Sequence, residues 1–82
     1  MSLVITAMKV VVLVTYLFAE HGIVEGPACA FGFAPDARSG MWGVCQEFQL
    51  QQTVAEHVPP GYMGQVFVCE LRDKWPDAGR CF

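Results

Sequence analysis

The sequence predicts a small, mostly β domain built from antiparallel strands. The chain has 82 residues, which is enough for one domain at most. Apolar and polar residues alternate over residues 42–54, the period of a half-buried strand. A Pro-Pro-Gly turn separates this run from a second apolar run, residues 63–72. We therefore expect an antiparallel hairpin in residues 20–82, preceded by a distinct apolar segment, residues 1–19.

The first predicted strand of the hairpin covers residues 42–54. Five of its seven even-numbered positions are apolar, and the odd-numbered positions are mostly polar. A helix over the same residues would place Gln49 and Gln52 on the face that carries Phe48, which is a poorer apolar face. The alternation therefore favours a strand.

The turn at residues 58–62 and the run after it predict the second strand. Pro60 and Gly61 match positions i+1 and i+2 of a type II turn, because proline fixes φ and glycine accepts a positive φ. Residues 63–72 start apolar on both faces, which is typical of a central strand. Residues 73–82 are expected to be irregular and held by Cys81.

Residues 20–40 contain repeated glycines and prolines that interrupt regular periodicity. This stretch is predicted to be mainly a connection. A short strand over residues 29–34 is compatible with the alternation of Phe31 and Phe33.

The apolar segment, residues 1–19, has three interpretations. It reads as a secretory signal with cleavage after Ala19, since Lys9 precedes an apolar core. It also reads as a buried strand, because eight of the seventeen residues 3–19 are β-branched. A membrane helix is the third alternative, although Lys9 near its middle would cost about 2.5–3.5 kcal/mol on insertion scales.

Four cysteines lie beyond the apolar segment, at positions 29, 45, 69 and 81. An even number in a small exported domain predicts two disulfides. The register of the predicted hairpin favours pairing Cys45 with Cys81 and Cys29 with Cys69. Reduced thiols in a cytosolic protein are the alternative. The wide spacing of the cysteines is unlike that of structural zinc sites, so we expect no metal.

The charge balance argues against a nucleic-acid partner. The formal net charge is −3, and residues 20–82 hold eight acidic and four basic side chains, too few cations to neutralise phosphates. A membrane partner is expected only if residues 1–19 are not cleaved. His21 and His57 each follow a glutamate but are expected in solvated loops. No catalytic residue and no cofactor is predicted, so we expect a protein that is not an enzyme.

The residues predicted to bind are aromatic residues and one methionine in or beside turns. Such side chains are enriched at protein interfaces. The sequence thus predicts a small exported, disulfide-stabilised β protein that binds another protein, in a secreted or extracytoplasmic location. The alternatives are a cytoplasmic or viral-type β module with reduced cysteines, working as a homodimer or interaction factor, and a single-span accessory subunit of a membrane complex. The candidate binding residues are Trp42, Tyr62, Met63, Trp75 and Phe82.

Overall fold

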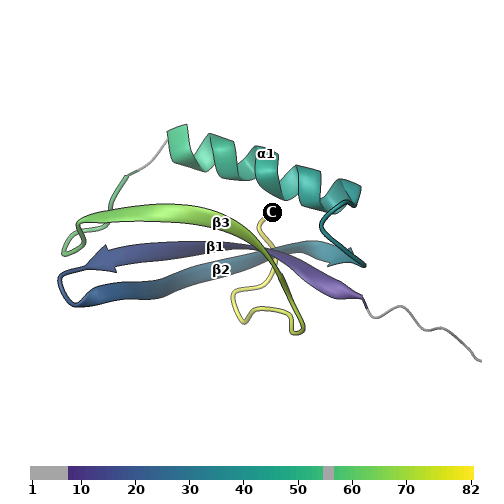
Figure 1. Cartoon of the computed structure of the whole chain (residues 1–82), viewed down its shortest axis with the longest axis horizontal. Helices are drawn as coiled ribbons and strands as arrows, with labels where there is room; N and C mark the ends of the chain where they lie inside the picture. Colours follow the sequence, from purple (N-terminus) through teal and green to yellow (C-terminus); the bar gives the residue numbers. More distant parts are fainter. Residues whose placement is uncertain (1–7, 55–56) are drawn as a thin grey trace, which may run out of the picture.

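The structure, a computed structural model that describes residues 8–54 and 57–82, is a three-stranded antiparallel sheet with one helix (Figure 1). The sheet order is β2-β1-β3. The predicted fold class, mostly β and antiparallel, is confirmed. The elements in chain order are β1 (Lys9–Ala19), β2 (Gly22–Ala34), α1 (Gly40–Val54) and β3 (Gly64–Arg72).

Strand β1 is the central strand and the core of the domain. It pairs with β2 along one edge and with β3 along the other. Val10, Val11, Val12 and Val14 are each at most 1% exposed. A run of β-branched residues suits a strand that is covered on both faces.

The central position of β1 bears on the three interpretations of residues 1–19. Lys9–Ala19 forms a strand, as the buried-strand alternative requires, and not the helix that a membrane span needs. No helix in the described part of the chain is long and apolar enough to cross a membrane. Cleavage after Ala19 would remove β1 from the sheet. The rest of the apolar segment, residues 1–7, lies outside the described residues.

Strand β2 corrects the prediction that residues 20–40 are mainly a connection. The strand runs through Gly26, Pro27 and Gly32. Pro27 is tolerated because β2 is an edge strand, where a missing N–H breaks few ladder bonds. The pairing of β2 with β1 shifts register at two places, so extra residues of β2 are accommodated without ending the strand. The predicted short strand at residues 29–34 is the second half of this longer one.

Helix α1 replaces the strand predicted over residues 42–54, so that prediction was wrong. Ser39 caps the helix, since its hydroxyl oxygen and its carbonyl oxygen accept from the Trp42 N–H at 3.4 and 3.1 Å. Glutamine, glutamate and leucine, which have good helix propensity, occupy every position from 46 to 52 except Phe48. Two even-numbered residues that the strand prediction placed inside, Val44 and Leu50, are 41% and 67% exposed. The face that packs on the core carries Met41, Trp42, Cys45 and Phe48.

Strand β3 confirms the strand predicted over residues 63–72, but it lies at an edge and not at the centre. Its antiparallel partner is β1, with Leu13 opposite Cys69. The predicted turn before it is present. The Tyr62 N–H donates to the Pro59 carbonyl at 3.3 Å, and Gly61 has a φ of 91°. Only glycine adopts that backbone conformation without strain.

Two disulfides form, as predicted, but the predicted pairing was wrong. The structure joins Cys29 to Cys81 and Cys45 to Cys69. The prediction relied on a hairpin between residues 42–54 and 63–72 that does not exist. Because α1 lies over the sheet, it brings Cys45 onto β3, and Cys81 is left to pair with β2.

Candidate binding surface

The segment after β3, residues 73–82, wraps around the sheet; we call it the C-terminal strap. It lies on the face opposite α1 and then turns toward the helix (Figure 1). Trp75 packs against the second hydrophobic cluster, formed by Val10, Val12, Val14 and Ala30. The strap thus covers a face of β1 that α1 leaves open. The prediction of an irregular tail held by Cys81 is confirmed.

The end of the strap is fixed to the outer edge of β2. The Ala30 N–H donates to the Gly79 carbonyl at 2.8 Å, and the Cys81 N–H donates to the Ala30 carbonyl at 2.9 Å. The disulfide from Cys29 to Cys81 lies next to these bonds. Phe82 then reaches the α1 side, where its ring centroid is 5.6 Å from that of Phe31.

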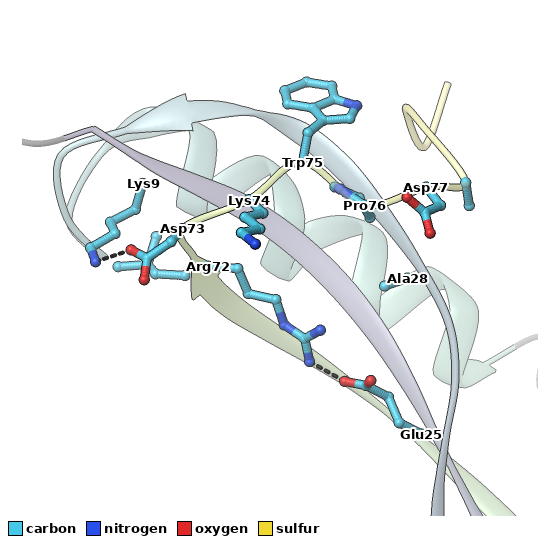
Figure 2. Close-up of a pocket in the computed structure, with 11 residues that line it drawn as sticks. Lys9, Glu25, Ala28, Arg72, Asp73, Lys74, Trp75, Pro76 and Asp77 are labelled. Carbon is cyan, nitrogen blue, oxygen red and sulfur yellow. Dashed lines mark hydrogen bonds and ion pairs between the residues drawn. The ribbon is translucent and has the colours of Figure 1, made fainter.

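An open hollow of about 810 Å³ lies between the strap and the sheet (Figure 2). Its floor includes Ala28, and the backbone of the strap forms one wall. Six charged side chains line the hollow, three of them cationic and three anionic. These side chains are Lys9, Glu25, Arg72, Asp73, Lys74 and Asp77.

Ion pairs fix several of these charges. Lys9 donates to Asp73, and Arg72 donates to both Glu25 and Glu70. The hydrogen bond from Lys9 lowers the pKa of Asp73 below its ordinary value, and the hydrogen bond to Glu25 raises the pKa of Arg72. Such pairs at a surface contribute little to stability. Their main effect here is to orient the side chains at the rim of the hollow.

Tyr16 is held protonated beside these pairs. Its hydroxyl donates to Glu70, and this bond, reinforced by desolvation, raises the pKa of Tyr16. A phenol with a raised pKa is a hydrogen-bond donor and a poor nucleophile at neutral pH. The hollow itself is lined by cationic donors, carboxylate acceptors and apolar side chains, which are the features of a binding surface.

Two exposed residues, Phe33 and Arg80, contact the partly buried Trp75 at the edge of this face, and we call the three the aromatic–arginine cluster. The ring centroids of Phe33 and Trp75 are 5.2 Å apart, and the guanidinium carbon of Arg80 lies 5.3 Å from the Trp75 centroid. Phe33 is 57% exposed although it belongs to β2. Only Trp75 of this cluster was among the residues predicted to bind.

The five predicted binding residues do not meet at one place. Trp42 is in the first turn of α1 and packs on the core, and Phe82 packs against Phe31 and Phe48. Tyr62 and Met63 precede β3 at the other end of the sheet. Trp75 packs on the face of the sheet opposite α1, so the structure separates the candidates into distinct surfaces.

Sequence reasoning missed Phe33 and Arg80. Phe33 follows a bulge in β2, so its side chain lies on the strap side while that of Phe31 packs toward α1. Arg80 precedes Cys81, but its position depends on the Cys29–Cys81 bridge that the sequence did not predict. The one available signal was the pair of nearby phenylalanines in residues 29–34.

A second exposed apolar group lies where the β1–β2 turn meets the start of β3; we call it the hairpin-end group. Ile23, Met63 and Val66 are 65%, 73% and 42% exposed. Phe18 connects Ile23 and Met63, since it pairs with Ile23 in the sheet and its backbone carbonyl accepts a hydrogen bond from the Met63 N–H at 2.8 Å. This group contains Met63 and neighbours Tyr62, two of the predicted residues.

The remaining chemistry-bearing residues are scattered. His21 and His57 are both exposed, in the β1–β2 turn and in the loop before β3. Within residues 8–54 and 57–82, no three His, Cys, Asp or Glu side chains are arranged to hold a metal ion. A smaller apolar cavity of about 200 Å³ lies between α1 and the sheet, beside Leu13, Phe48 and Phe67.

No family model, no curated protein and no solved structure matches this chain.

Proposed function

We propose that this protein is a small disulfide-stabilised β domain that works by binding another protein through the aromatic–arginine cluster. The observation that carries the proposal is the exposure of Phe33, 57%, beside a tryptophan and an arginine that already contact each other. Tryptophan, tyrosine and arginine contribute most of the binding energy in many interfaces.

The setting of the cluster supports this role. Phe33 comes from a strand and Trp75 is packed on the core, so neither ring has to be ordered on binding. Pre-ordered side chains reduce the entropic cost of association. The paired charges around the hollow would supply a polar rim next to the aromatic centre, which is the usual arrangement of an interface.

The two disulfides support an oxidising location for the folded protein. We propose an extracytoplasmic location in which β1 is retained. A form cleaved after Ala19 is not proposed, because it would lack the central strand.

Site-specific photocrosslinking in the native host tests the proposed surface. A photoreactive phenylalanine analogue replaces Phe33 in one variant and Met63 in another, so that the hairpin-end group serves as the matched control. We expect a discrete crosslinked protein from position 33 and not from position 63. Crosslinks at position 63 alone would move the binding surface to the hairpin end. Crosslinks at neither position would contradict the proposal.

Once crosslinking has identified the partner, affinity measurements with that purified partner test which side chains of the cluster contribute to binding. Phe33→Ser and Arg80→Glu change exposed side chains, so the fold should be retained and circular dichroism checks this. Each change should weaken binding about 10-fold or more, whereas Met63→Ser should leave the dissociation constant unchanged. A crosslink to a second copy of this chain would show that the partner protein is the same chain and that the complex is a homodimer.

A further inference from the structure

We infer that the two disulfides have different roles, and that the Cys29–Cys81 bridge is a reducible latch that controls the aromatic–arginine cluster. The control of binding rests on the proposed function, whereas the latch itself does not. Reduction of this one bridge should release the end of the strap and leave the body of the domain folded. The Cys45–Cys69 bridge should stay closed under the same conditions.

The two bridges differ in their access to solvent. Cys45 is 0% exposed and Cys69 is 9% exposed, and both belong to the hydrophobic cluster between α1 and the sheet. Cys29 and Cys81 pack against the margin of the same cluster, but both are only partly buried, on the edge strand β2 and near the end of the strap. Thiol–disulfide exchange requires an attacking thiolate to reach a sulfur atom, so the less buried Cys29–Cys81 bridge should react first.

The exchange reaction is balanced with a dithiol such as dithiothreitol. One thiolate of the reagent attacks a sulfur of the bridge and forms a mixed disulfide, while the other cysteine leaves as a thiolate. The second thiol of the reagent, as its thiolate, then attacks the reagent sulfur of the mixed disulfide, and the remaining cysteine leaves as a thiolate. Cys29 and Cys81 end as thiols, and the reagent ends as a cyclic disulfide that has given up two electrons.

Besides the bridge, the end of the strap is held by the ring of Phe82, which contacts Phe31 and Phe48 but is itself 79% exposed, and by backbone hydrogen bonds. Two backbone hydrogen bonds join it to Ala30, one through the Gly79 carbonyl and one through the Cys81 N–H. They lie on the outer edge of the sheet, where backbone bonds open locally at low cost. Arg80 lies between these two anchors, so it should leave Trp75 when they open.

The body of the domain has an independent set of contacts. Helix α1 stays joined to β3 by the buried bridge, and β1 keeps both of its strand partners. Trp75 follows β3 by only three residues and packs on a core cluster, so it should stay closer to the sheet than Arg80 does. Reduction is therefore expected to loosen residues 79–82 first.

A dithiothreitol titration of the oxidised protein tests the order of reduction. Free thiols are alkylated at each concentration and assigned by peptide mass mapping. Cys29 and Cys81 should become alkylated at concentrations about 10-fold below those needed for Cys45 and Cys69. Simultaneous reduction of both bridges, or reduction of the buried bridge first, would overturn the inference.

Hydrogen exchange tests what the latch holds. In protein reduced only at the exposed bridge, the amides of Ala30 and Cys81 should exchange at least about 10-fold faster, whereas the amides of β1 should be unchanged. A variant with Cys29→Ser and Cys81→Ser should show the same pattern. Should that variant fail to fold, the partially reduced native chain still gives the answer. Unchanged exchange at Ala30 and Cys81 would contradict the latch.

The link to binding uses the crosslinker at position 33. Crosslinking should fall several-fold after selective reduction and return after reoxidation. If the oxidised protein gave no crosslink from position 33, this would contradict the proposed function but not the latch. Equal crosslinking before and after a confirmed selective reduction would separate the latch from binding and overturn that part of the inference.

Discussion

The side-chain amide of Gln49 donates to the backbone carbonyl of Phe67 at 2.6 Å. Helix α1 thereby occupies a backbone acceptor of β3, which is an edge strand of the sheet. Open strand edges invite pairing with other chains, and proteins commonly cover or interrupt them. Gln49 therefore connects the helix to the sheet and protects the middle of the β3 edge.

Gln49→Ala should destabilise the domain by about 1 kcal/mol, because it leaves the Phe67 carbonyl without this partner. Chemical denaturation measures the change in the free energy of unfolding. The control is Gln51→Ala, which alters an exposed glutamine of the same helix and should have an effect near zero. The contact would have no stabilising role if both variants unfolded at the same denaturant concentration.

A chain that begins at Glu20 should not fold, because it lacks the strand that joins β2 to β3. Val10, Val11, Val12 and Val14 are almost wholly buried, and their loss removes residues that β1 contributes to the two hydrophobic clusters, Val11 to one and the other three to the second. The matched chain, residues 8–82, should give a dispersed NMR spectrum and a cooperative melt. A folded chain 20–82 would show instead that the cleaved form proposed from sequence is viable.

Gly32→Ala should destabilise the domain by about 1–2 kcal/mol. Gly32 has a φ of 154°, and a Cβ there would lie 2.8 Å from the Cε of Met41. Gly43→Ala is the opposite case, since the helical position is exposed and its Cβ would meet nothing within 4 Å. Alanine should stabilise α1 there by up to about 1 kcal/mol. Thermal unfolding of both variants should show shifts of opposite sign.

Tyr16 should make stability fall at alkaline pH. Its pKa is raised above 10.0 in the folded state, mainly by the hydrogen bond to Glu70. This contribution is complete below the unfolded pKa and is lost as the pH rises through the folded pKa. Ultraviolet absorbance of tyrosinate in a Tyr62→Phe background follows Tyr16 alone.

Glu70→Gln should lower the pKa of Tyr16 toward its ordinary value. The substitution removes the carboxylate that accepts the hydrogen bond from the Tyr16 hydroxyl and that repels the phenolate. Tyr16→Phe should remove this part of the alkaline loss of stability. An unchanged Tyr16 titration in the Glu70→Gln variant would be evidence against the hydrogen bond.

The sequence predicted correctly those elements that short-range backbone preferences specify. The Pro60-Gly61 turn and the strand from Gly64 to Arg72 depend on backbone preferences that act over a few residues. Residues 42–54 were different, because their alternation and their helix-forming composition pointed to different structures. Ser39 and the packing of Cys45 on the sheet decide for the helix.

The candidate surface was less predictable than the strands. Trp75 could be named from its residue type, but its neighbours depend on long-range contacts. Phe33 belongs to β2, and Arg80 reaches Trp75 only because the strap ends at the β2 edge. Residues 33 and 80 are far apart in the chain, and no periodic pattern connects them.

The sequence by itself determined a small, mostly β chain and favoured two disulfides over reduced thiols, because composition, turn residues and an even number of cysteines carry that information locally. The tertiary structure decided which strand lies at the centre, which cysteines pair and which aromatic side chains stay exposed. Each of these depends on the partner that packs against a residue. The apolar run at residues 9–19 becomes the central strand because β2, β3, α1 and the C-terminal strap enclose it.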